Sequence, residues 1–181
     1  MNGRIIMKNI FLIFMLGIFG FAGGAISESS GAHTPASAPH KIKALVLGCV
    51  DYRMAFDDLP NFAKQLGLVD EADLVTMPGA SLAAVFKTND PAINDLRPAF
   101  DDMVQFLRVV HGFDTVYVVD HRDCGMYKHV YKDNFASERV AETNQHKENM
   151  IKLKRKLDKL GLKSRYFLMD VNGTYEEIIL P

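Results

Sequence analysis

Cysteine is scarce in this sequence, with two residues among 181. Two cysteines exclude a disulfide-rich scaffold and allow either a single disulfide or a share in one metal site. An excess of charge of one sign is also lacking, because 21 Lys and Arg residues are balanced by 22 Asp and Glu residues. A formal net charge of −1 gives no electrostatic drive toward a polyanion, so nucleic acid is not an expected partner.

The sequence has no internal repeat, and its composition is that of an ordinary globular protein. Hydrophobic residues make up 48% and charged residues 24% of the chain, which excludes wholesale disorder, collagen and coiled coil. With roughly 150 residues per domain as a guide, we expect one globular domain.

Residues 1–27 have the order of a secretory signal peptide. Arg4 and Lys8 precede an uncharged run over 10–26 that is rich in Phe, Leu and Ile and then thins into Gly and Ala. An Ala-x-Ser pattern ends this run and predicts a mature N-terminus near Glu28. We therefore expect a periplasmic or secreted protein. The alternative is an uncleaved membrane anchor, for which an uncharged run of about 17 residues is at the short limit.

Residues 28–40 contain Ser, Ala, Gly and Pro with little apolar content, so we expect a disordered lead-in. Loss of residues 1–27 removes two basic side chains and changes the net charge from −1 to −3. The folded domain is expected to span 41–181.

From residue 41 onward, strand-like and helix-like segments alternate. Short apolar or β-branched runs predict strands over 43–48, 72–77, 115–120 and 165–170. Segments with helical spacing predict helices over 55–66, 96–111 and 138–160. Asn172-Gly173 then predicts a hairpin into a last strand over 175–179.

This alternation predicts an α/β fold, with a mostly parallel sheet flanked by helices on both faces and a C-terminal hairpin strand. In such sheets, ligands bind beyond the carboxyl ends of the strands, at the point where the strand order reverses. We therefore expect the functional residues just after Gly48, Met77 and Asp120.

Both cysteines follow predicted strands. The run C-V-D-Y-R (49–53) follows the first strand, and H-R-D-C-G (121–125) follows the third. If the two loops are neighbours, they bring together Cys49, His121 and Cys124. Two thiolates and an imidazole with one open position make a catalytic zinc site, and zinc suits these ligands.

Asp51 is the candidate for a fourth ligand, because it lies two residues after Cys49. Arg53 lies two residues further on and can hold the Asp51 carboxylate in a bidentate pair, away from the metal. The alternative for the two cysteines is one disulfide between Cys49 and Cys124, which an exported protein allows. The His, Asp and Arg residues around them favour the metal site.

The pattern C-x-D-x-R after one strand and H-x-x-C-G after a later one resembles the β-class carbonic anhydrases, over roughly residues 41–180. The resemblance implies that Cys49, His121 and Cys124 bind Zn2+ and that Asp51 and Arg53 form a catalytic dyad. Asp51 would accept a hydrogen bond from zinc-bound water or, in a resting form, take the fourth position itself.

The activity implied by this resemblance is the reversible hydration of carbon dioxide to bicarbonate and a proton, by a homodimer or higher homo-oligomer. One alternative is hydrolysis of COS or CS2, which are linear analogues of CO2, on the same fold. The other is a catalytically silent zinc-binding protein in which Asp51 stays on the metal.

The sequence also departs from the pattern of that family. Residues 76–81 read T-M-P-G-A-S where the family usually has a loop of the Arg-Asn-Ala-Gly-Asn type. Asp120 stands where the family commonly has Gly and is expected to put an extra negative charge close to the metal. Tyr52 stands where the family often has a small residue.

The remaining histidines have no expected role in the site. His111 ends a predicted helix and is expected to be a cap or surface residue. His129 and His146 lie in segments rich in Lys and are expected to be solvated, as is the charged run over 147–159.

Overall fold

A five-stranded sheet in the order β2-β1-β3-β4-β5 forms the centre of the domain. The computed structural model describes residues 41–91, 93–132 and 138–181. Strands β1 to β4 are parallel to one another, and β5 runs antiparallel to β4. This arrangement confirms the predicted mostly parallel sheet with a C-terminal hairpin. The strands are β1 (Ala44–Gly48), β2 (Ala72–Thr76), β3 (Thr115–His121), β4 (Lys163–Met169) and β5 (Tyr175–Glu177).

Helices connect the strands, and the three predicted helices are confirmed to within a few residues. A π-helical turn over Met54–Asp58 leads directly into α1 (Leu59–Gln65). The long helices are α3 (Arg97–His111) and α5 (Arg139–Lys159). Two short helices, α2 (Ser81–Val85) and α4 (Gly125–Tyr131), were not predicted from the sequence.

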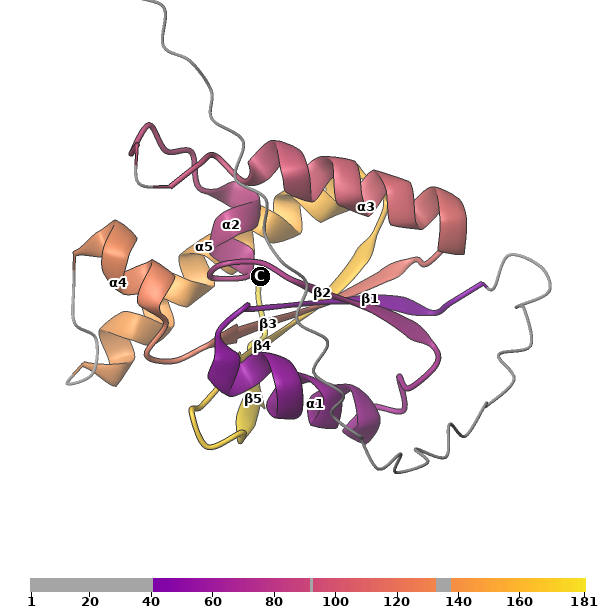
Figure 1. The fold of residues 1–181 in the computed structure, drawn as a ribbon, viewed down its shortest axis with the longest axis horizontal. Helices are drawn as coiled ribbons and strands as arrows, with labels where there is room; N and C mark the ends of the chain where they lie inside the picture. Colours follow the sequence, from indigo (N-terminus) through magenta and orange to yellow (C-terminus); the bar gives the residue numbers. More distant parts are fainter. Residues whose placement is uncertain (1–40, 92, 133–137) are drawn as a thin grey trace, which may run out of the picture. The chain divides into compact units, whose positions relative to one another are not determined.

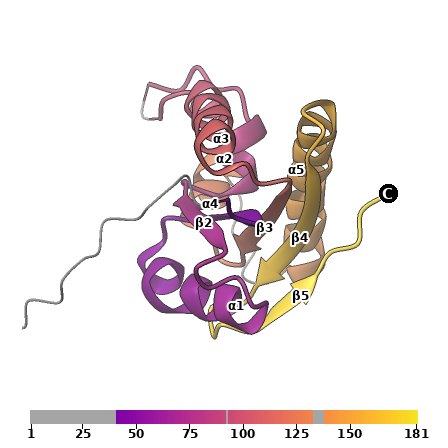
Figure 2. The same ribbon diagram turned by 90° about the vertical axis from the view of Figure 1, so that its right-hand side faces the viewer.

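The helices cover both faces of the sheet, as Figures 1 and 2 show. Helix α1 lies on one face, and α2, α3 and α5 lie on the other. The buried hydrophobic side chains accordingly form two main clusters. One contains Met54, Leu59 and Phe62 against one face of the sheet, and the other contains side chains from α3 and α5 against the opposite face.

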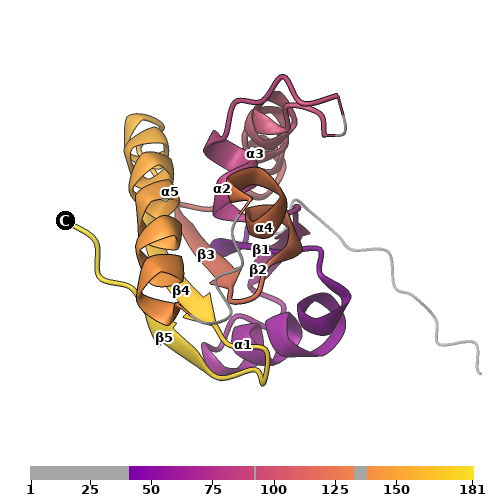
Figure 3. The ribbon, with the colours of Figure 1, turned by 90° about the vertical axis from the view of Figure 1, so that its left-hand side faces the viewer.

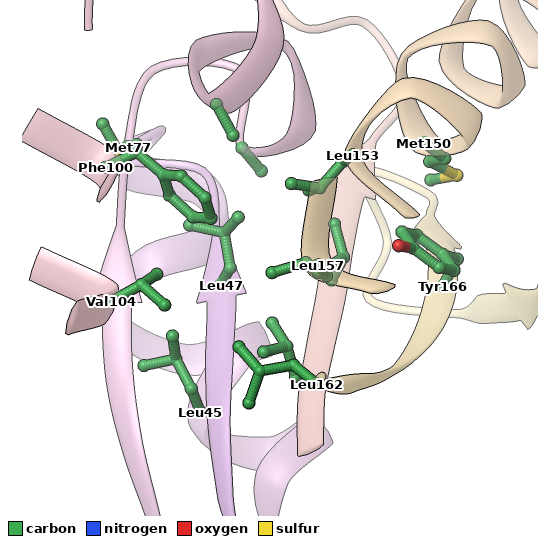
Figure 4. Close-up of a cluster of buried hydrophobic side chains, with 14 of the residues drawn as sticks. Leu45, Leu47, Met77, Phe100, Val104, Met150, Leu153, Leu157, Leu162 and Tyr166 are labelled. Atoms are coloured by element: carbon green, nitrogen blue, oxygen red, sulfur yellow. The ribbon is translucent and has the colours of Figure 1, made fainter. Parts of the chain in front are cut away.

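Strand β1 supplies side chains to both clusters because successive residues of a strand point to opposite faces. Ala44 and Val46 belong to the cluster under α1, whereas Leu45 and Leu47 belong to the cluster under α3 and α5. Figure 4 shows Leu45 and Leu47 between Val104 of α3 on one side and residues of the α5 region on the other. This double burial explains why the strand reads as a continuous apolar run.

Helix α5 buries a single row of side chains despite its many charges. Met150, Leu153 and Leu157 are fully buried against the sheet, and the Lys-rich positions between them are more exposed. The same row includes His146, which is completely buried. The expectation that His146 is solvated is therefore wrong, since it lies on the one face of α5 that packs inward.

The predicted signal peptide (1–27) and lead-in (28–40) lie outside the described residues. Within the described ranges, none of the helices has both the length and the apolar character that a membrane span requires.

Candidate metal centre

The two sequence motifs meet at the carboxyl ends of β1 and β3. These strands are neighbours, and the chain passes from β1 to β2 on one side and then returns to β3 on the other. Cys49 directly follows β1, His121 is the last residue of β3, and Cys124 directly precedes α4. Figure 3 looks onto this end of the sheet, where α4 lies in front of the strands. The motifs thus lie where the strand order reverses, which is where parallel sheets bind ligands.

Three buried side chains there can hold a metal ion. The ligand atoms of Cys49, His121 and Cys124 all lie within 4.8 Å of one another. The sulfurs of Cys49 and Cys124 are 4.0 Å apart, and both cysteines are free. The structure therefore places the two thiols side by side without the alternative disulfide.

The His121 ring is oriented for metal binding. Its Nδ1 lies 2.8 Å from the Arg122 carbonyl oxygen and donates a hydrogen bond to it. That bond leaves Nε2 as the atom with a lone pair, and Nε2 is buried without any hydrogen-bond partner. Buried polar atoms without a partner are rare in proteins, and a metal ligand whose other ring nitrogen is anchored is one reason for such an atom. The donor set thus fits a metal ion.

The contact between the two thiols shifts their pKa values in opposite directions. It lowers the pKa of Cys49 although burial opposes this, and the nearby His121 and the backbone N–H of Gly79 lower that pKa further. The same contact and burial raise the pKa of Cys124. A thiolate, the form that binds metal, is therefore already favoured at Cys49.

The backbone around Cys49 depends on two glycines. A Cβ on Gly48 would clash with the Leu59 side chain, so glycine lets α1 pack close to the end of β1. Gly79, which has a φ of +74°, donates its N–H to the Cys49 sulfur at 3.3 Å. The altered 76–81 loop thus contacts the candidate ligand directly.

Asp51 lies beside the three ligand residues and is held by Arg53. The Arg53 Nε and Nη2 atoms donate to the two carboxylate oxygens of Asp51 at 3.0 and 2.8 Å. The Arg53 backbone N–H donates a third bond at 3.0 Å. These contacts lower the pKa of Asp51 to about 2, so the carboxylate is ionised at neutral pH. Its Oδ2 lies 3.8 Å from His121 Nε2.

The carboxylate of Asp51 does not belong to the group of mutually close ligand atoms, which contains only Cys49, His121 and Cys124 among the described residues. The Asp51 carboxylate lies apart from them because the Arg53 guanidinium donates hydrogen bonds to both of its oxygens.

Asp123 is a residue of the site that we did not predict from the sequence. Its Oδ2 accepts a hydrogen bond from Arg53 Nη1 at 2.8 Å, and its backbone carbonyl accepts one from Nη2 at 3.1 Å. Lys128 also donates to the Asp123 carboxylate. Arg53 is thereby fixed between two aspartates. Arg53 and Asp123 lie 70 residues apart in the chain, and the sequence offers no signal for this contact other than the position of Asp123 between two ligands.

Asp120, the residue before His121, is buried, and hydrogen-bond donors surround its carboxylate. Its buried carboxylate accepts hydrogen bonds from the Ser81 N–H at 2.9 Å and from the Ser81 hydroxyl at 2.5 Å. Tyr127 donates a third at 2.8 Å, and His146 Nδ1 donates a fourth at 2.9 Å. Such a set of donors is what the burial of a carboxylate requires.

The other sequence candidates lie outside this cluster. Tyr52 is 78% exposed, so its bulk is directed to solvent. His129 is partly exposed and contacts Asp90, with 3.0 Å between its Nε2 and Asp90 Oδ2. His111 ends α3 and bonds through Nδ1 to Asp73 Oδ2 at 2.8 Å. These positions agree with the expectation of a helix-end or surface residue for His111 and of a partly solvated residue for His129.

Solved structures similar to this fold include β-carbonic anhydrases at low sequence identity. One is from the fungal pathogen Aspergillus fumigatus, with 15% identity, 78% of each chain covered and a TM-score of 0.48. Another is one of two tetrameric β-carbonic anhydrases from Sordaria macrospora, with 13% identity, 78% of this chain and 82% of that chain covered, and a TM-score of 0.48. We therefore derive the function from the site residues and not from these neighbours.

Sequence relatives are found in Rickettsia. No family model matches the chain. An uncharacterized protein of Rickettsia bellii is 32% identical over 141 residues, which cover 77% of this chain and 83% of the relative. The uncharacterized protein RC0076 of Rickettsia conorii is 32% identical over 143 residues, which cover 77% of this chain and 73% of the relative. The chain therefore belongs to the same protein family as these two uncharacterized Rickettsia proteins.

Proposed function

We propose that this protein is a zinc lyase that hydrates carbon dioxide reversibly to bicarbonate and a proton. The observation that carries the proposal is the combination of three buried ligand atoms within 4.8 Å and an ionised carboxylate fixed beside them by Arg53. The resemblance of the two motifs to those of β-class carbonic anhydrases supports the same activity.

Zinc is the metal that suits this donor set best. Two thiolates and a neutral imidazole are ligands that zinc prefers, and three protein ligands leave a fourth position open for reaction. The buried Nε2 of His121, which has no partner, would be satisfied by the ion. When bound, zinc supplies a Lewis acid that makes hydroxide available near neutral pH.

Asp51 and Arg53 would position the water that reacts. The Asp51 carboxylate is ionised and can accept a hydrogen bond, so it orients the nucleophile while Arg53 keeps it in place. Asp123 in turn keeps Arg53 in place through two further hydrogen bonds. Water and CO2 together give bicarbonate and one proton, which is released to solvent.

The same arrangement bears on the silent alternative, in which Asp51 stays on the metal. Both carboxylate oxygens of Asp51 already accept hydrogen bonds from Arg53, and Arg53 is itself held by Asp123. Movement of Asp51 onto the metal would have to break this fork. The observed pairing therefore favours the active form over the silent one.

Stopped-flow CO2 hydration by protein of known zinc content tests the proposal. We expect one zinc per chain and a rate that rises from about pH 6.5 to about pH 8.5, because zinc-bound water ionises near pH 7. A fully zinc-loaded protein without hydration at pH 8.5 would favour the silent alternative. Faster turnover of COS or CS2 than of CO2 would favour the hydrolase alternative on the same fold.

We also propose a homo-oligomer. Val50 and Tyr52, within the 49–53 motif, are 47% and 78% exposed, and Phe56, just after it, is 86% exposed. Exposed apolar side chains that gather in one segment often mark protein interfaces. Light scattering should give a mass of at least two chains, and Phe56→Glu should lower it. A monomer at all concentrations would contradict this proposal.

Export is the remaining proposal, and it is supported by the basic, apolar and small-residue order of the first 27 residues. Mass spectrometry of the native protein should find an N-terminus close to Glu28. Recovery of the intact leader on soluble cytosolic protein would contradict it.

A further inference from the structure

The 76–81 loop contacts the candidate metal centre through one backbone hydrogen bond. The Gly79 N–H donates to the Cys49 sulfur at 3.3 Å, and both groups are buried. Hydrogen bonds to a ligating sulfur reduce the electron density that it donates and so tune the bound metal. The position of Gly79 therefore matters for the properties of the centre.

The backbone that positions Gly79 is strained. Ala80, the next residue, has a φ of +44° and a ψ of −100°, a backbone conformation that residues other than glycine rarely adopt. Ala80 is completely buried. Such conformations are energetically unfavourable and persist only where the surrounding structure enforces them. Some contact must therefore hold the loop at this point.

Asp120 supplies that contact. It accepts two hydrogen bonds from Ser81, one from the backbone N–H and one from the hydroxyl, directly after the strained residue. Its carboxylate is also tied to α4 through Tyr127 and to α5 through His146. All four residues are almost completely buried. The loop is thereby attached to the end of β3 by a carboxylate that accepts four hydrogen bonds.

We propose that Asp120 is a positioning residue of the metal centre, which fixes the strained turn through Ser81 and so keeps the Gly79 N–H on the Cys49 sulfur. This inference deepens the proposed function and rests on metal binding by Cys49, His121 and Cys124. Asp120 acts through the loop and does not itself contact the metal or the substrate.

Three variants loaded with Co2+ test this role. In Asp120→Asn, we expect the amide oxygen to take the place of Oδ2, which accepts from the Ser81 hydroxyl, Tyr127 and His146. The amide nitrogen then takes the place of Oδ1 and faces the Ser81 N–H, so this hydrogen bond is lost because both groups are donors. Ser81→Ala removes the hydroxyl contacts with Asp120 and Tyr127 and keeps the bond from the backbone N–H. Tyr127→Phe is the control, because it removes one buried donor to Asp120 and the contact with the Ser81 hydroxyl but leaves both bonds from Ser81 to Asp120 in place.

The sulfur-to-cobalt charge-transfer band is the main readout, and zinc affinity is the second. We expect the band to move to lower energy in Asp120→Asn, and less far in Ser81→Ala, because the Cys49 sulfur loses its hydrogen bond. Zinc affinity should fall about 10-fold to 100-fold in Asp120→Asn, as for other residues that orient metal ligands. In Tyr127→Phe the band should stay unchanged even though the melting temperature falls. A role in stability alone would not separate these variants in this way.

Unchanged bands in Asp120→Asn and Ser81→Ala would overturn the proposal, as would an equal shift in Tyr127→Phe. If Asp120→Asn does not fold, the comparison of Ser81→Ala with Tyr127→Phe decides. Failure of the wild type to bind Co2+ or Zn2+ would instead refute the metal site and with it the proposed function. The two failures are therefore distinguishable.

Discussion

Replacement of Arg53 by alanine should abolish most of the activity without loss of the metal. Arg53 makes three hydrogen bonds to Asp51 at 2.8 to 3.0 Å, and the pKa of Asp51 falls from 3.8 to about 2 mainly because of them. Each unit of pKa corresponds to about 1.36 kcal/mol, so the side-chain fork stabilises the ionised, oriented carboxylate by ~2 kcal/mol. Both side chains are less than one third exposed, so water screens this interaction only in part.

The ordinary pKa of the Asp51 carboxyl is 3.8, so it stays ionised at neutral pH without Arg53, and what the variant loses is its orientation. Loss of an oriented charge at a catalytic centre commonly lowers the rate by on the order of 10² to 10³. We therefore expect turnover of CO2 by Arg53→Ala to fall by on the order of 10² to 10³ in stopped-flow assays. Zinc content should stay at one per chain, because Arg53 is not a ligand. In Arg53→Lys the charge remains but the fork is lost, so an intermediate rate is expected.

The chain contains a matched control for this experiment. Asp95 and Arg97, at the start of α3, form the same Asp-x-Arg pairing, with hydrogen bonds from the backbone N–H, Nε and Nη2 of Arg97. Arg97→Ala removes an equivalent fork outside the metal centre and should leave turnover unchanged. Full zinc content with undiminished CO2 hydration in Arg53→Ala would refute the role assigned to Arg53, and so would an equal loss of activity in Arg97→Ala.

Three further predictions concern the metal, the core and the pH dependence. Cys49→Ser should lose most of its zinc by elemental analysis, and full occupancy would contradict the ligand assignment. Phe62→Ala, in the buried cluster under α1, should lower the free energy of unfolding by about 3–5 kcal/mol in urea titrations, whereas Val109→Ala, which changes an 81% exposed side chain, should have an effect within about 0.5 kcal/mol. Because the pKa of Asp51 is lowered in the folded protein, its pairing with Arg53 stabilises the fold above about pH 4 and is lost as the pH falls toward 2. The difference in stability between the wild type and Arg53→Ala should shrink over that range, and a difference that grows there would contradict the assigned ion pair.

The strands and the proximity of the two motifs were predictable because burial leaves a strong signal in the sequence. Strand β1 is buried on both faces, so residues 44–47 are all apolar and the strand ends visibly at Gly48 and Cys49. Strand β3 gives a similar signal before His121. The parallel sheet then requires that the ends of neighbouring strands lie at the same edge, which brings the two motifs together.

The short helices and the buried polar network were not predictable for equally physical reasons. Helices α2 and α4 contain five and seven residues, which is too short for a hydrophobic period to be recognised. His146 sits among charged residues of α5, and only the tertiary packing shows that its row faces inward. The contacts that bury Asp120 come from Ser81, Tyr127 and His146, which lie on three different helices.

The separation of the ligands along the chain has a consequence for the order in which the protein folds. Cys49 and Cys124 are 75 residues apart in the chain, yet their sulfurs are 4.0 Å apart. The ligand set does not exist until β3 has paired with β1, and closure of so long a loop costs entropy before any contact repays it. A metal that binds only the completed set would stabilise the native state over the unfolded chain by an amount that rises with the logarithm of the free metal concentration. The bound metal would thus hold the ends of β1 and β3 together, and a chelator would make the whole domain easier to unfold.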